Sequence, residues 1–94
     1  MAEFLVELYV SRADAAALER AERQARRAAE ELLRGGMPIR YLRAIFVPDD
    51  ETCFLLYEAA SAEAVREAMK RAALPADRIL ETFGQLSPET LPHT

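Results

Sequence analysis

The side chains in this chain that could do chemistry are acids, tyrosines and an arginine in strand-like segments. Two nearby carboxylates can bind a cation or exchange a proton, and Glu7 and Glu58 are expected on central strands, where they could be neighbours. Tyrosine adds an apolar ring with a hydroxyl tip, which suits the orientation of a small molecule in a cleft. The predicted ligand-binding residues are Glu7, Tyr9, Tyr41, Arg43, Tyr57 and Glu58.

A structural role competes with each of these assignments, and it is the simpler interpretation. Glu7 and Glu58 could form ion pairs with Arg40 or Arg43 at the rim of a sheet, because the strand register that would decide their neighbours cannot be read from the sequence. Tyrosines on such strands commonly pack in a core or in an interface. The ligand-binding and structural roles therefore both remain as hypotheses.

The other reactive residue types favour structural roles. Cys53 is the single cysteine, lies in an apolar segment without a histidine base beside it, and is expected to pack in the core. The acidic run 49–51 lacks the spacing of a calcium loop and is typical of a hairpin turn. The single histidine, His93, falls near the C-terminus and is expected at the surface. No catalytic triad, phosphate-binding loop or cysteine–histidine cluster is present, so we predict no catalytic residue and no metal ligand.

Length and charge limit the class of protein. A chain of 94 residues has room for one domain with one core. The net charge is −4 and the arginines alternate with glutamates, so we expect no nucleic-acid partner. No apolar run approaches the roughly 20 residues that span a bilayer, and the first residues lead directly into a strand pattern, so we expect a cytoplasmic protein without a membrane partner.

Hydrophobic periodicity predicts three elements in the first half. Residues 3–10 alternate as a half-buried strand, with Phe4, Val6, Leu8 and Val10 on the buried face. A helix begins after the N-cap Asp14 and ends at Gly35 and Gly36. Its predicted buried side consists of Leu18, Ala21, Ala25, Ala28 and Leu32. Residues 39–47 form the second predicted strand.

The second half repeats the pattern in the order strand, helix, strand. The turn 48–51 joins residues 39–47 to a strand at 52–58 as an antiparallel hairpin. Ser61 caps a second helix, which ends at Leu74-Pro75 and whose predicted buried side consists of Val65, Ala68, Met69 and Ala72. Residues 78–83 form a last strand. The domain is predicted at 3–84, with a C-terminal tail at 85–94.

This order predicts an α+β, ferredoxin-like βαββαβ sandwich, with a four-stranded antiparallel sheet and two helices on one face. The strands 39–47 and 52–58 are apolar on both faces. Ile39, Tyr41, Ile45 and Val47 are predicted to alternate with Leu42, Ala44 and Phe46. Helices on one face would leave the other apolar face in water, which monomers rarely tolerate. We therefore expect a homodimer of the dimeric α+β barrel type, packed sheet to sheet, with space for a ligand.

Several segments resemble a bacterial family of small domains of unknown function, some members of which are described as nickel-binding. The resemblance covers about residues 3–83, and its most specific parts are the hairpin 46–54 and the segment 71–79. It implies a ferredoxin-like fold and dimerisation. Histidines of the nickel-associated members align near Arg43 and Met69, and neither side chain here offers the imidazole that nickel prefers. Nickel is thus a cofactor suggested by the resemblance alone, and we predict none.

Two functional hypotheses follow. The first is a non-enzymatic dimeric binding protein that holds a small ligand between its sheets. The alternative is a cofactor-independent enzyme of the dimeric α+β barrel type, an oxygenase or isomerase for a small apolar substrate, with tyrosine and glutamate as proton-handling groups. The lack of any catalytic constellation in the sequence favours the binding protein.

Overall fold

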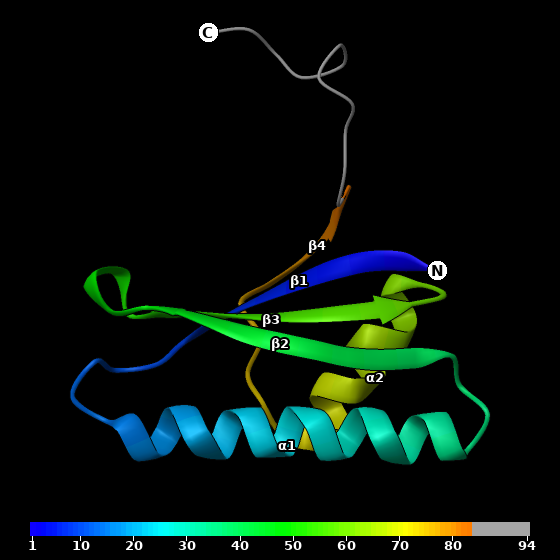
Figure 1. Ribbon diagram of the computed structural model, residues 1–94, viewed down its shortest axis with the longest axis horizontal. Coiled ribbons are helices and arrows are strands. Elements are labelled where there is room, and N and C mark those ends of the chain that lie inside the picture. Colours follow the sequence, from blue (N-terminus) through cyan, green and yellow to red (C-terminus); the bar gives the residue numbers. More distant parts are fainter. Residues whose placement is uncertain (84–94) are drawn as a thin grey trace, which may run out of the picture.

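The computed structural model describes residues 1–83 and confirms the predicted architecture (Figure 1). Its elements are β1 (Ala2–Tyr9), α1 (Ala15–Arg34), β2 (Ile39–Val47), the short 3-10 helix η1 (Pro48–Asp50), β3 (Thr52–Ala59), α2 (Ala62–Ala72) and β4 (Arg78–Thr82). The strands form one antiparallel sheet in the order β2-β3-β1-β4, and both helices lie on the same side of it. The predicted tail 85–94 lies outside the described residues.

The core lies between the sheet and the helices, and β1 shows how the sequence builds it. Phe4, Val6, Leu8 and Val10 are at most 4% exposed, as their alternation predicts. Opposite them, the buried face of α1 is made mostly of alanines, whose small side chains let the helix backbone approach the sheet. The buried residues of α1 are Ala21, Ala25, Ala28, Ala29 and Leu32.

Local signals fix where α1 begins and ends. The carboxylate of Asp14 accepts a hydrogen bond from the N–H of Ala17 at 2.9 Å, which satisfies one of the free amides of the first turn. At the other end, Gly36 has a φ of 97°, a left-handed conformation that glycine adopts without the steric cost of a Cβ. Both features confirm the boundaries that the sequence predicts.

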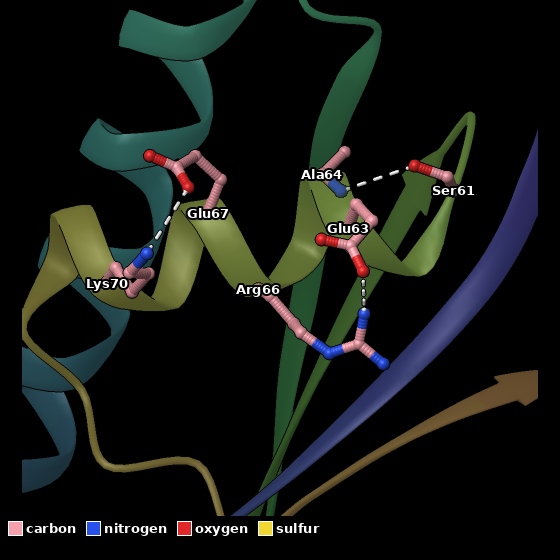
Figure 2. Close-up of polar contacts among 6 residues, drawn as sticks. All are labelled: Ser61, Glu63, Ala64, Arg66, Glu67 and Lys70. Carbon is pink, nitrogen blue, oxygen red and sulfur yellow. Dashed lines mark hydrogen bonds and ion pairs between the residues drawn. The ribbon is translucent and has the colours of Figure 1, made fainter.

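The helix α2 follows the same rules (Figure 2). The Ser61 hydroxyl accepts a hydrogen bond from the N–H of Ala64 at 3.4 Å, and the helix ends at Ala73, which has a left-handed φ of 55°. The predicted buried residues Val65, Ala68, Met69 and Ala72 all lie in the core, together with Ala64. Neither helix in the described part of the chain is long and apolar enough to cross a membrane.

The strand β2 departs from the simple alternation that the sequence predicts. The pairing of β2 with β3 shifts between Tyr41 and Arg43, so Leu42 is an extra residue in a β-bulge. Before the bulge, Ile39 and Tyr41 face the helices. After it, the even-numbered Ala44 and Phe46 do so, as their place against the core shows. The prediction that Tyr41, Ile45 and Val47 share a face was therefore wrong, because one inserted residue reverses the alternation beyond it.

Candidate binding face of the sheet

The face of the sheet away from the helices is called the open face here. In Figure 1 no described helix or strand covers it. Its side chains follow from the cross-strand register, because directly paired residues point to the same side. They are Glu3, Leu5, Glu7 and Tyr9 of β1, Arg40, Arg43, Ile45 and Val47 of β2, Thr52, Phe54, Leu56 and Glu58 of β3, and Arg78, Leu80 and Thr82 of β4.

The centre of the open face is apolar. Leu5 on β1 pairs directly with Leu56 on one side and Leu80 on the other, so three leucines lie in a row across three strands. Phe54 and Ile45 pair with each other in the next cross-strand row, which also contains Glu7, and they extend the apolar surface to the edge strand β2. We call these five side chains the apolar band. Ile45 is 40% exposed and Leu80 39%, while the other three are half-buried.

Charged residues lie on both sides of the apolar band. On one side, Arg40 contacts Glu58 at 3.4 Å between Nη1 and Oε1, and Glu58 is paired in the register with Glu3. On the other side, the Nε of Arg78 donates to Oε2 of Glu7 at 2.8 Å. The Arg40–Glu58 pair agrees with the structural role that the sequence analysis offered for Glu58. The partner of Glu7 was missed, because Arg78 is 71 residues away in the chain.

The two predicted acids are not neighbours. Glu58 pairs with Glu3, and Glu7 lies four residues further along the same strand. At about 3.3 Å per residue, this offset separates them by roughly 13 Å along β1. The hypothesis that Glu7 and Glu58 form one carboxylate pair within a protomer was therefore wrong. Each carboxylate instead has its own arginine.

Two further predicted residues also lie on the open face. Tyr9 is at the end of β1 and is 63% exposed. Arg43 follows the bulge, is exposed, and pairs in the register with Leu56 of the apolar band. Within residues 1–83, no carboxylate comes close enough to Arg43 to form an ion pair with it. Glu7, Tyr9, Arg43 and Glu58 thus surround the apolar band.

Tyr41 and Tyr57 point to the opposite side, toward the helices. Tyr57 is fully buried and its hydroxyl donates to the carbonyl oxygen of Ala25 at 3.4 Å. The Tyr41 hydroxyl donates to the carboxylate of Glu22 at 2.9 Å, and the guanidinium of Arg26 lies 5.3 Å from the Tyr41 ring centre. The rings of the two tyrosines meet edge to face at 5.5 Å. These two residues do not share a face with the other four.

Burial makes Tyr41, Tyr57 and Cys53 poor proton donors. Desolvation raises the pKa of both tyrosine hydroxyls, and the bond to Glu22 raises that of Tyr41 further because it stabilises the protonated form. Cys53 has no exposed surface, and burial, with a smaller effect of the Glu22 charge, raises its pKa from 9.0 to about 11. A thiol that stays protonated is a weak nucleophile and a weak metal ligand. Cys53 packs in the core, as predicted.

The described residues do not fit a nickel site. Within residues 1–83, no three side chains of histidine, cysteine, aspartate or glutamate come together as a metal ion would require. Arg43 and Met69 also lie on opposite sides of the sheet, since Arg43 is on the open face and Met69 is a buried residue of α2. Histidines at these two positions would not meet within one protomer. His93 lies outside the described residues.

Comparisons with known proteins place the chain in a family. A family model described as "Nickel responsive protein SCO4226-like" matches residues 4–82. Among solved structures, SCO4226 from Streptomyces coelicolor A3(2) is similar, with a TM-score of 0.67 and 24% identity over 86% of this chain and 95% of that chain. A search of curated proteins gave no match. The structural match supports the fold, and the family match covers almost all described residues. The chain belongs to the SCO4226-like family of nickel-responsive proteins.

Proposed function

We propose that this protein is a small, cytoplasmic, homodimeric binding protein. Two copies pack with their open faces together and hold a small ligand between the sheets. The observation that carries the proposal is the apolar band, formed by Leu5, Ile45, Phe54, Leu56 and Leu80. The buried thiol of Cys53, the single cysteine, is compatible with a reducing compartment.

The distribution of charge supports a second copy as the occupant of this face. Stable interfaces have an apolar centre and a polar rim that stays in contact with water. The open face has the same plan, because the Arg40–Glu58 and Glu7–Arg78 pairs lie on either side of the apolar band. A second copy would cover the band and leave those ion pairs near the rim.

The ligand would meet Glu7, Tyr9, Arg43 and Glu58 around an apolar surface. Covering the sheet would take Arg43 out of water, and a buried cation without a counter-charge is strongly unfavourable. A carboxylate from the second copy or from the ligand would supply that charge. These groups orient a polar ligand, while the leucines contact its apolar part. Tyr41 and Tyr57 have no part in this site.

Nickel binding is less well supported than binding of a small organic molecule. The family's description concerns nickel response, but the described part of this chain brings together no set of three ligands. The enzymatic alternative is also weaker. Its proton-handling groups, Tyr41 and Glu58, lie on opposite faces of the sheet, so they cannot act on one substrate within a protomer.

The dimer is tested by native mass spectrometry of Leu56→Glu. We expect a dimer for the natural sequence and a monomer for the variant, because a carboxylate in the middle of the apolar band would be buried without a partner. Leu33→Glu is the matched control, since Leu33 is 50% exposed on α1, away from the open face. Circular dichroism verifies that both variants fold. A folded dimer of Leu56→Glu would remove the open face from the interface.

The ligand is tested with the same method. A dimer whose mass exceeds that of two chains retains a ligand, and its mass identifies the chemical class. We expect Arg43→Ala and Glu7→Gln to lose that extra mass while the dimer remains. Unchanged retention in both variants would exclude these residues from the site.

A further inference from the structure

A hollow lies on the helix side of the sheet, between α2 and β4. It has a volume of about 470 Å³, within the range of small-molecule sites. It exists because β4 is an edge strand that α2 covers only in part. Ile79 faces the helix side opposite Val6, yet Ile79 stays half-buried whereas Val6 has no exposed surface. A second copy on the open face would leave this hollow accessible.

The hollow, called the α2–β4 groove here, has an apolar floor. Met69 from α2, Leu74 from the following loop and Ile79 from β4 line it. Met69 is 4% exposed and belongs to the core, so the floor is firmly held. Such a floor suits an aliphatic or aromatic body rather than a bare inorganic ion.

Basic side chains of α2 lie at the mouth of the groove, although the chain as a whole has a net charge of −4. Arg66 and Lys70 line it from α2, and Asp77 is the one carboxylate among its lining residues within 1–83. Arg78 also lines the groove, but its guanidinium pairs with Glu7 on the open face.

Figure 2 shows that Arg66 and Lys70 extend from α2 toward Glu63 and Glu67. Nη1 of Arg66 is 2.5 Å from Oε1 of Glu63, and Nζ of Lys70 is 3.9 Å from Oε2 of Glu67. Exposed pairs of this kind contribute only about 0 to 1 kcal/mol, so a ligand can replace the glutamates at little cost.

We propose that the α2–β4 groove binds an amphipathic monocarboxylate. The carboxylate lies between Arg66 and Lys70, and the apolar part lies on Met69, Leu74 and Ile79. Arg66 and Lys70 disfavour a neutral lipid or alcohol, because binding it would separate these two basic side chains from water without a compensating charge. The apolar floor disfavours phosphate or sulfate for the opposite reason. This site is independent of the proposed site between the sheets.

The test is a titration of the ¹⁵N-labelled full chain with sodium octanoate, followed by amide chemical shifts. We expect saturable shifts for residues 66–79, and at least about tenfold weaker binding, equivalent to ~1.4 kcal/mol, in the double variant Arg66→Gln/Lys70→Gln. The matched control Arg20→Gln/Arg23→Gln removes the same charge from the exposed side of α1 and should bind as the natural sequence does. Octanol should bind at least about tenfold more weakly than octanoate.

Several results would overturn the proposal. These are an absence of saturable shifts at millimolar octanoate, shifts concentrated on the open face, equal binding of octanol, or equal weakening by the α1 control. If the Arg66→Gln/Lys70→Gln variant does not fold, the comparison of octanoate with octanol on the natural sequence decides alone. Native mass spectrometry of the same samples reports the dimer separately, so failure of one proposal is distinguishable from failure of the other.

Discussion

The two faces of the sheet are built from the same strands, but the helices cover one face and no described element covers the other. On β3, Leu55 has no exposed surface under the helices, whereas its neighbour Leu56 is only half-buried on the open face. The helix-covered face buries neutral groups, including the thiol of Cys53 and the hydroxyl of Tyr57. The open face surrounds its leucines with solvent-exposed ion pairs. One face stabilises the protomer, and the other has the composition of a contact surface.

The largest expected effect comes from comparing adjacent leucines. Leu55→Ala should lower the free energy of unfolding by about 2 to 5 kcal/mol, because it opens a cavity in a fully packed core. Leu56→Ala should cost about 1 kcal/mol or less at low protein concentration, where the open face is in water. Urea denaturation measures both.

Protein concentration sharpens the same comparison. If the open face is a dimer interface, the loss caused by Leu56→Ala should grow as concentration rises, since association adds to the stability of the folded state. The loss caused by Leu55→Ala has its source inside the protomer and should change less. Equal losses at every concentration would contradict the distinction between the faces.

Alkaline pH should lower the free energy of unfolding by a smaller amount, through buried groups on the helix-covered face. Folding raises the pKa of Cys53 from 9.0 to about 11, so between these values the unfolded chain loses a proton that the folded chain retains. The free energy of unfolding should therefore fall as pH rises from 9 to 11, by about 2 to 3 kcal/mol. The raised pKa values of Tyr41 and Tyr57 act in the same direction.

Urea denaturation at pH 8, 9, 10 and 11 measures this slope, and Cys53→Ala is the informative variant. Its absolute stability will differ because the core is altered, but its decline with pH should be shallower than that of the natural sequence. If the free energy of unfolding fell equally with pH in both proteins, the pKa of Cys53 would be the same in the folded and unfolded chains.

A comparison of Tyr41 with Tyr9 predicts a difference in the free energy of unfolding of about 1 kcal/mol. Tyr41→Phe removes the hydrogen bond to Glu22 and should lower the free energy of unfolding by this amount. Tyr9→Phe changes a side chain that is 63% exposed and should be neutral within about 0.5 kcal/mol. Thermal unfolding of the two variants in parallel tests this prediction. A larger loss of stability for Tyr9→Phe than for Tyr41→Phe would contradict it.

The smallest effect is expected from the ion pairs on the open face. Glu58→Gln should change the free energy of unfolding by no more than about 1 kcal/mol, because Arg40 and Glu58 are both in contact with solvent. The difference should shrink further at high salt, where such pairs are screened. A loss that is large and insensitive to salt would show that this pair is buried in the assembled protein.

The sequence predicts the elements well because their signals are local. Asp14 and Ser61 mark helix starts, Gly36 marks a helix end, and the alternation from Phe4 to Val10 marks one face of a strand. The ferredoxin-like order follows from those elements. The candidate site was only partly predictable. Four of its six predicted residues share the open face, and the role of Arg78 beside Glu7 was not foreseen.

The sequence by itself thus determined the order of elements, their caps and the buried side of each helix, because these depend on residues within a few positions of one another. Tertiary structure alone decided which side chains meet on the sheet. The bulge at Leu42 reverses the faces of β2, and pairing between distant strands places Leu5 between Leu56 and Leu80. Register is set by packing across the whole sheet, so a pattern within one strand cannot reveal it.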